Sequence, residues 1–385
     1  MKSIYLDNAA TTQLDQRVLD AMLPYLRENF GNASSIHNLG RQAAVAVEES
    51  REKIAHYIGA EPSEIIFTSG GTESNNSIIK GVTAASEKKH IITSRVEHHA
   101  VLHPIQYGRK DGIKATYLDC RPTGSVTPKQ VEEAITDDTV LVSLIHVNNE
   151  IGAINPISEI SQICHEKNVY LHSDTVQSVG KIPVNVDDLG VDFMNISGHK
   201  IYGPKGVGAL YVRGGSKWKP WMEGGSQERR RRGGTLNVPG IVGLGKALEL
   251  AVDEMEKGQD HIKELQQRMV MGLEERFPDL IAFNGDPDSG IYNIVNFSFP
   301  LDDDKALDGE MLLLNLDVEG ICCSNGSACT SGAVEASHVL MALGMVTPTA
   351  KSSLRFSLSK NNTREDVDYT LEKLDGIVHR MLETA

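Results

Sequence analysis

The sequence is poor in cysteine and has no long apolar run. Its 385 residues include five cysteines, and no two of them have the Cys-x-x-Cys spacing of a zinc ribbon. So few cysteines, odd in number, are atypical of a secreted scaffold held by disulfides. No stretch approaches the roughly 18 consecutive apolar residues of a membrane-spanning helix, so we expect no span. The first residues, MKSIYLDNAA, lack the pattern of a signal peptide, and we expect a cytoplasmic protein.

Positive charge is also scarce. Lys and Arg number 38 against 52 Asp and Glu, which gives a formal net charge of −14. This balance argues against direct binding of nucleic acid and against an anionic membrane surface as a partner. What is present is ordinary for a globular protein, with 40% hydrophobic and 23% charged residues. At roughly 150 residues per domain, the length predicts two or three domains with a large buried core.

Short β-branched runs alternate with helical patterns between about residues 60 and 212. Capping signals predict helices after Thr127 and after Asn155-Pro156. The run at 140–146 is almost continuously apolar, as expected of a strand covered on both faces. The alternation predicts an α/β fold with a mostly parallel, doubly wound sheet covered by helices. The seven expected strands are 65–68, 90–94, 114–118, 140–146, 169–173, 193–197 and 207–212.

The pattern changes after about residue 240. A long helical stretch covers 240–277, with a break expected near Gly258, and a strand-like run, YNIVNFSF, follows at 292–299. Further helices are expected at 308–316 and 364–382. These elements predict a smaller α+β domain at the C-terminus. We expect the following division of the chain: an N-terminal segment over 1–15 that packs with the small domain, a large cofactor-binding domain over 16–257, and a small domain over 258–385 that contains a cysteine loop.

Three strand ends carry residues suited to chemistry, and ligands of such sheets bind at the carboxyl ends of strands. Gly70-Gly71-Thr72 follows the first strand and suits a phosphate at a helix N-terminus, although such a turn can also be a tight connection. Asp174 could hold a cationic ring nitrogen or cap a helix. Lys200 could form a Schiff base or be a surface lysine in a turn. Together the three groups are those that bind pyridoxal phosphate.

Three of the five cysteines fall within residues 322–329. Cys329 lies in a stretch of Ser, Gly and Ala that is typical of a loop, and it is the candidate nucleophile. Cys322 and Cys323 follow Gly320-Ile321 at the expected end of a strand, which favours packing. Cys120 and Cys164 have apolar or helical neighbours, and we expect them to be inert.

Eight segments in order along the chain resemble the cysteine desulfurases of the NifS/IscS kind, which belong to the class-V group of fold-type-I pyridoxal-phosphate enzymes. The resemblance runs almost from end to end. It implies a large domain with a seven-stranded, mostly parallel sheet and a smaller C-terminal domain. The segments are YLDNAATT at 5–12, FTSGGTESNN at 67–76, EHHAVL at 97–102, HVNNEIG at 146–152, HSDTVQSVGK at 172–181, SGHKIYGPKGVGALYV at 197–212, GGSQERRRRGGT at 224–235 and SNGSACTSG at 324–332.

The resemblance implies a pyridoxal 5′-phosphate site with catalytic roles for Lys200, His98 and Cys329. Lys200 would bond covalently to the cofactor, Asp174 would pair with its ring nitrogen, and Gln177 would bond its phenolic oxygen. His98 would stack on the ring. Ten cofactor-binding positions are implied: Gly71, Thr72, His98, Asn149, Asp174, Gln177, Ser197, His199, Lys200 and Thr235.

Two further implications concern the substrate and the assembly. Asn149 and Arg355 would hold the amino acid substrate, since the Arg fork suits a carboxylate. Thr235 would reach the phosphate of the partner subunit, which implies a homodimer. The reaction would convert L-cysteine to L-alanine and leave a persulfide on Cys329. An acceptor protein, an iron–sulfur scaffold or a thiolation protein, would take the sulfur.

Departures and alternatives remain. Asn325 replaces the Ser that is usual in the family. IscS-like relatives extend beyond the point where MLETA ends this chain, so we expect it to resemble the shorter NifS-like members. Selenocysteine lyase, aminotransferase and non-catalytic sulfur carrier are the rival functions, and an intact Lys200 argues against the last. His98, His99 and His103 lack a further ligand at metal spacing, so no metal is expected. The run Arg229–Arg232 could be a patch for a polyanion, but we expect a solvated loop with one or two arginines turned toward the active site or the dimer partner.

Overall fold

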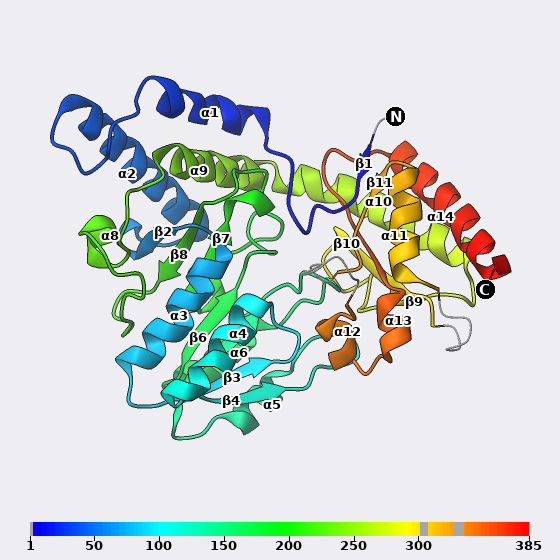
Figure 1. The fold of residues 1–385 in the computed structure, drawn as a ribbon. Coiled ribbons are helices and arrows are strands. Elements are labelled where there is room, and N and C mark those ends of the chain that lie inside the picture. The colour runs from blue at the N-terminus through cyan, green and yellow to red at the C-terminus, as the bar shows by residue number, and fades with distance from the viewer. Residues whose placement is uncertain (1–2, 301–306, 327–334, 385) are drawn as a thin grey trace.

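The computed structural model describes residues 3–300, 307–326 and 335–384. A central sheet lies in the larger part of the molecule (Figure 1). Only β8 runs opposite to its neighbours, and the other pairings are parallel. This confirms the predicted mostly parallel α/β fold, with all seven expected strands placed to within one residue at either end. In spatial order the strands are β2 (Ile65–Thr68), β8 (Gly208–Val212), β7 (Phe193–Ser197), β6 (Tyr170–Asp174), β5 (Thr139–Ile145), β3 (His90–Ser94) and β4 (Lys114–Leu118).

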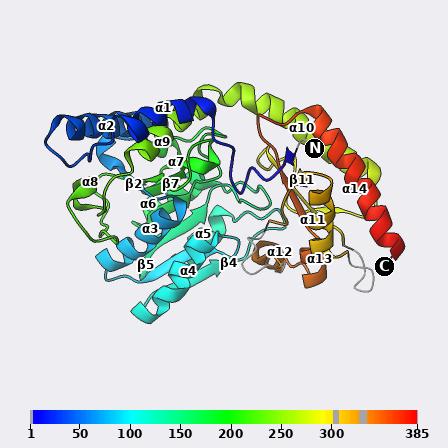
Figure 2. The same cartoon turned by 45° about the horizontal axis from the view of Figure 1, so that its top comes forward.

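Helices cover both faces of this sheet, because alternate side chains of each strand point to opposite sides. Ile65 and Phe67 pack with one set of helices and Ile66 with the other. The first set includes the layer of long helices that Figure 2 shows along one side of the sheet. It consists of α1 (Gln16–Arg27), α2 (Asn38–Ile58), α5 (Pro128–Ala134), α6 (Ile157–Glu166), α7 (Val186–Leu189) and α9 (Val238–Asp253). The second set is α3 (Gly71–Ala85) and α4 (His99–Tyr107).

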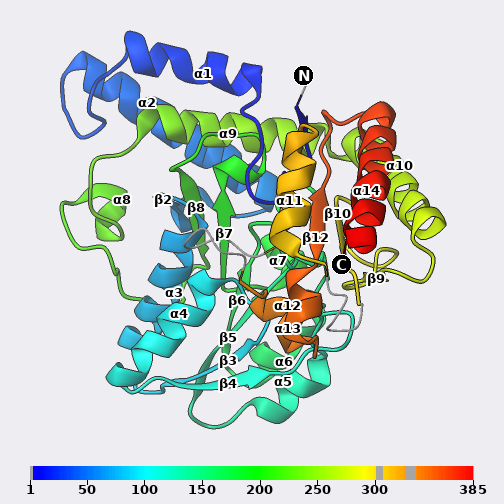
Figure 3. The ribbon, with the colours of Figure 1, turned by 45° about the vertical axis from the view of Figure 1, so that its right-hand side comes forward.

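The C-terminal part has its own sheet and its own core. Figure 3 shows α10 and α14 side by side next to β10 and β12. Their apolar faces form one cluster with strand residues such as Phe297 and Phe356, and with Ile4 and Leu6 from the start of the chain. The antiparallel sheet is β12 (Leu354–Ser357), β10 (Ile294–Ser298) and β9 (Ala282–Phe283), and a parallel pair is formed by β1 (Ile4–Tyr5) and β11 (Ile321–Cys322). The helices are α10 (Met255–Arg276), α11 (Gly309–Val318), α12 (His338–Ala342), α13 (Thr347–Lys351) and α14 (Arg364–Thr384).

The break in the long helical stretch lies at Glu254, and the prediction of a break near Gly258 is wrong. Glu254 separates α9 from α10, and Gly258 lies inside α10. A glycine is the usual signal for a break, but here long-range ion pairs involve the residue at the break. The Glu254 carboxylate accepts hydrogen bonds from Arg17 and from Lys360. The pairing partners are distant in sequence, so the local pattern gave no sign of them.

The N-terminal segment joins the two parts of the molecule. After β1 it passes between them (Figure 1). Asn8 donates to the Ser357 carbonyl on one side, and Thr12 donates to the His199 carbonyl on the other. Short elements complete the structure: η1 (Pro62–Glu64), η2 (Gly108–Asp111), η3 (Gly198–Lys200) and α8 (Gln227–Arg230). Within residues 3–300, 307–326 and 335–384, no helix combines the length and apolarity that a bilayer crossing demands.

Candidate active site

A cavity of about 510 Å³ lies where the carboxyl ends of β5, β6 and β7 face the N-terminal segment and β12. It is the place where the sheet topology predicts a ligand. Nine of the ten predicted cofactor-binding residues line it, as does Arg355. Its full lining is Asp7, Ala9, Ala10, Gly71, Thr72, Asn75, His98, Ile145, Asn149, Asp174, Val176, Gln177, Ser197, His199, Lys200, Ser324, Gly326 and Arg355.

Lys200 ends the short helix η3, directly after β7. Its Nζ donates to the carbonyl oxygens of Ala9 (2.6 Å) and Ala10 (2.8 Å). Burial, followed by the positive charge of Arg355, lowers the pKa of Lys200 to about 8. A substantial fraction of this amine is therefore neutral near physiological pH, which is the form that attacks a carbonyl carbon. The alternative of an ordinary surface lysine does not agree with this environment.

Asp174 is the last residue of β6 and is 4% exposed. Its Oδ2 accepts a hydrogen bond from Nδ2 of Asn75 at 2.7 Å, and Asn195 in turn donates to Asn75 Oδ1. Oδ1 accepts from the backbone N–H of Val176 at 3.2 Å. A turn follows, so the alternative of a helix cap is wrong. The amide relay fixes a carboxylate at the cavity wall, where it can pair with a cationic ring nitrogen.

The Gly70-Gly71 turn leads directly into α3, whose first N–H groups have no partner within the helix. Gly70 has φ +143°, and a Cβ on Gly71 would lie 2.8 Å from Cγ2 of Val176, so both positions require glycine. The first-turn acid Glu73 is paired with Arg232 at 2.8 Å. That pairing offsets the negative charge nearest the turn, and the turn can accept a phosphate.

The guanidinium of Arg355 is fixed by two acceptors. Nη2 donates to Asp7 Oδ1 at 2.7 Å, and Nη1 donates to the Asn149 carbonyl at 2.8 Å. Nε is buried and has no hydrogen-bond partner within the part of the chain that the structure describes. A buried unpaired donor is costly unless a ligand completes it, so this edge of Arg355 suits a substrate carboxylate.

His98 caps the N-terminus of α4. Its Nδ1 accepts a hydrogen bond from the backbone N–H of Ala100 at 3.0 Å, which leaves Nε2 for a ligand. Burial lowers the pKa of His98, so the ring is neutral near pH 7 and can accept a proton. His199 also lines the cavity, and its Nδ1 lies 3.2 Å from Oγ1 of Thr11; burial lowers its pKa to about 4.

Two predicted residues are not among those lining the cavity. Thr235 is exposed in the loop between α8 and α9, on the same chain, and its role toward a partner subunit stays a prediction. Cys329 lies outside the described residues. Ser324 and Gly326, which precede it in the chain, do line the cavity.

The other cysteines are not activated. Burial raises the pKa of Cys120 and Cys164 to about 12, and it also raises the pKa of Cys322 and Cys323. Thiols held in this protonated state are poor nucleophiles. This agrees with the packing role that the sequence predicted for them.

Four residues that contribute to the site were missed from the sequence. Asn75 holds Asp174, Asp7 holds Arg355, and the carbonyls of Ala9 and Ala10 hold Lys200. Asp7 and the two alanines lie in the YLDNAATT segment, and Asn75 lies in FTSGGTESNN. Their presence in those segments was a signal, but their roles depend on contacts across the fold.

These residues fit pyridoxal phosphate. The glycine turn at the start of α3 matches the phosphate, Asp174 the ring nitrogen, and Lys200 the aldehyde carbon. The need for glycine at the turn and the lowered pKa of Lys200 are independent features of this structure. Among the described residues, no group of three or more His, Cys, Asp or Glu side chains is placed to hold a metal ion.

Comparison with known proteins gives the family. Residues 4–370 match the family described as Aminotransferase class-V, and the chain belongs to this family of pyridoxal-phosphate enzymes. It is 51% identical over 382 residues to "Cysteine desulfurase IscS" of Dictyoglomus turgidum, covering 99% of this chain and 95% of the relative. It is 46% identical to "Cysteine desulfurase" of Mus musculus, with 100% and 83% covered.

Solved structures are similar to this chain in fold as well as in sequence. A "NIFS-LIKE PROTEIN" is 38% identical and superposes with a TM-score of 0.91, covering 98% of this chain and 100% of that one. "SspA in complex with cysteine" is 36% identical with a TM-score of 0.81, covering 94% and 100%. The predicted family, fold and cofactor are therefore confirmed.

Proposed function

We propose that this protein is a cysteine desulfurase that takes the sulfur of L-cysteine onto Cys329 and releases L-alanine. The full-length identity to proteins named cysteine desulfurase supports this activity. The observation that carries it is one cavity in which Lys200, Asp174 and Arg355 meet. We also propose that the enzyme is cytoplasmic and that it forms a homodimer.

Bound pyridoxal phosphate supplies an electron sink that weakens the bonds at the Cα of the substrate. Residues of the chain bind the substrate, pair with the cofactor ring and move protons. Arg355 binds the substrate carboxylate through its free edge, with Asn149 beside it. Asp174 keeps the ring nitrogen protonated by charge pairing. Lys200 and His98 are the groups of the cavity that can hold or move the proton of Cα.

Sulfur transfer is then a displacement on the substrate sulfur. The Cys329 thiolate forms an S–S bond, the C–S bond breaks, and its electron pair stays with the three-carbon fragment. A proton on that fragment gives L-alanine, and Cys329 retains a persulfide. Attack by a thiol of an acceptor protein on the outer sulfur regenerates Cys329. Iron–sulfur cluster assembly, cofactor sulfuration and tRNA thiolation are the pathways that would draw on this product.

Incubation with pyridoxal phosphate and L-cysteine tests the activity. We expect equal amounts of L-alanine and transferable sulfur. Lys200→Ala should abolish both, while Lys205→Ala, a change at the nearby exposed lysine, should abolish neither. Alanine without transferable sulfur, or turnover only with selenocysteine, would contradict the proposal. Keto acid as the main product would favour an aminotransferase.

Support for the homodimer comes from the surface. Thr235 is exposed in its own chain. Large apolar side chains are also exposed on α1 and α2, in the loop between these helices, and beside the loop of Thr235. They are Leu26, Phe30, Ile36, Val45, Trp221 and Met222. Exposed apolar groups of this kind are typical of protein interfaces.

A further inference from the structure

A second lysine is buried beside the cavity, four residues after Gln177. Lys181 is 9% exposed, and its Nζ donates to Gln177 Oε1 at 2.6 Å. On its other side the same amide donates, through Nε2, to the Ala9 carbonyl at 2.8 Å. Gln177 is 2% exposed and lines the large cavity. Lys181 therefore touches a cavity residue without lining that cavity.

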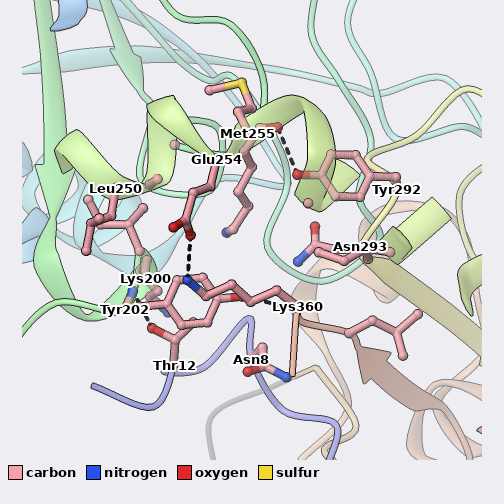
Figure 4. Close-up of a pocket in the computed structure, with 17 residues that line it drawn as sticks. Asn8, Thr12, Lys200, Tyr202, Leu250, Glu254, Met255, Tyr292, Asn293 and Lys360 are labelled. Atoms are coloured by element: carbon pink, nitrogen blue, oxygen red, sulfur yellow. Dashed lines mark hydrogen bonds and ion pairs between the residues drawn. The ribbon is translucent and has the colours of Figure 1, made fainter. Parts of the chain in front are cut away.

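The backbone of Lys181 is held by the C-terminal part of the molecule. Its carbonyl accepts hydrogen bonds from Nε2 of Gln259 (2.6 Å) and from the hydroxyl of Tyr292 (2.8 Å). Lys181 lines a second, smaller cavity of about 50 Å³ that Lys200 also lines, and Figure 4 shows Tyr292 and Lys200 at its wall. Gln259 and Tyr292 thus hold the backbone of Lys181 from outside the central sheet.

The two neighbours of the Gln177 amide are of opposite kinds. The Ala9 carbonyl only accepts hydrogen bonds, and the Nζ of Lys181, charged or neutral, has N–H groups that it donates to Gln177 Oε1. An amide whose oxygen must face Lys181 and whose nitrogen must face Ala9 has one orientation, because the flipped amide would lose both bonds. In that orientation one N–H of Gln177 remains for a ligand that accepts a hydrogen bond.

We propose that Lys181 is a positioning residue that fixes the Gln177 amide so that its nitrogen, and not its oxygen, faces the phenolic oxygen of bound pyridoxal phosphate. This inference rests on the proposed function, which places the cofactor in the large cavity. The reverse orientation would set the amide oxygen against a phenolate, which is repulsive. Lys181 thus acts on the cofactor through Gln177.

Burial of this lysine is otherwise unfavourable. Desolvation, and then the positive charges of Lys200 on η3 and Arg355 on β12, lower the pKa of Lys181 to about 7. Gln177 Oε1 is the one hydrogen-bond acceptor that its Nζ has among the described residues. Lys181→Met removes the cost of desolvating the amine but leaves Gln177 Oε1 without its donor, so the two effects on stability oppose each other. We therefore expect Lys181→Met to fold with a Tm close to that of the wild type.

The test is the pH titration of the cofactor absorption in the holoenzyme. A donor to the phenolic oxygen stabilises its negative charge, so it lowers the pH at which the neighbouring lysine-bound nitrogen loses its proton. Lys181→Met should raise that midpoint by about one pH unit, the size of one net hydrogen bond. Gln177→Leu should raise it similarly. The double variant should match Gln177→Leu alone, because Lys181 has nothing further to orient.

Lys360→Met is the matched control. Lys360 lines the same small cavity but pairs with Asp15 and Glu254, so the midpoint should not move. An unchanged midpoint in Lys181→Met, or a shift that adds to that of Gln177→Leu, would overturn the inference. Lys181→Leu serves the same test if the Met variant does not fold. If the wild type takes up no cofactor, the proposed function itself fails, and this outcome is distinct from the other two.

Discussion

Arg355 and Asp7 form an ion pair between residues 348 positions apart, with Nη2 and Oδ1 separated by 2.7 Å. The side chains are 5% and 21% exposed. Asp7 belongs to the N-terminal segment and Arg355 to β12. The pair therefore ties the start of the chain to the wall of the cavity, and it orients the guanidinium before any substrate arrives.

Arg355→Lys should lower kcat/KM for L-cysteine by about 10²-fold, chiefly through KM. A lysine keeps the charge but cannot bind Asp7 and a substrate carboxylate with one planar fork. Steady-state kinetics of alanine formation measure the change. Arg268→Lys is the control, since Arg268 makes an exposed pair with Asp368. A change of less than threefold in Arg355→Lys would show that another group binds the carboxylate.

The lowered pKa of Lys200 predicts how cofactor uptake depends on pH. Only the neutral amine attacks the aldehyde, and the folded protein has a pKa of about 8 at this lysine where 10.5 is usual. The rate at which apo protein develops the cofactor's yellow absorption should rise with pH and level off above about pH 8. Stopped-flow absorbance measures it. A rate that keeps rising toward pH 10.5 would mean that Lys200 is an ordinary solvated lysine.

Asp174→Ala should lower the turnover rate by at least about 10²-fold, the usual effect of removing one preorganised charge. Asn75→Ala should give a smaller loss in the same direction, because it frees the Asp174 carboxylate without removing it. The exposed Asp188 provides a control in Asp188→Ala. Alanine formation at saturating L-cysteine is the measurement. Normal turnover in Asp174→Ala would leave this residue only a structural role.

Most strands of the sheet could be predicted because each is marked by a short segment of the sequence with a strong apolar pattern. The strand ends made Lys200 and Asp174 candidates, and the resemblance implied their roles and supplied the other site residues. The helix break at Glu254 and the Asp7–Arg355 pair could not be predicted. Glu254 and Asp7 both pair with residues far away in the chain, and charge alone does not identify which partners meet. The role of Lys181 could not be predicted either, because only the fold shows that Lys181 and Gln177 are both buried.

Dimerisation can be tested by complementation between inactive sites. If Thr235 reaches the partner's phosphate, each site uses Lys200 of one chain and Thr235 of the other. Thr235→Ala should weaken cofactor affinity about tenfold or more, by loss of a bond to a charged group. Mixed with Lys200→Ala chains, it should form heterodimers in which one site is complete. Tight cofactor binding should then return to that site, while an active monomer in sedimentation would contradict the proposal.

Cys329→Ser separates cofactor binding from sulfur transfer. The variant should keep the yellow cofactor and should still bind L-cysteine, because Lys200, Asp174 and Arg355 are unchanged. It should form no persulfide, since a serine hydroxyl is almost wholly protonated near neutral pH and attacks sulfur poorly. The measurement is transfer of labelled sulfur from L-cysteine, followed by peptide mapping of the persulfide. We expect the label on Cys329 in the wild type and none in the variant.

Cys322→Ser and Cys323→Ser are the matched controls for Cys329. Both thiols have a raised pKa, so neither provides a thiolate near pH 7, and both variants should keep most of the turnover. Sulfur label on Cys322 or Cys323 would transfer the nucleophile's role to that residue. Persulfide formation at the wild-type rate in Cys329→Ser would mean that another group is the nucleophile. Either result would reject the Cys329 mechanism, and the cofactor assignment at Lys200 would stand independently of it.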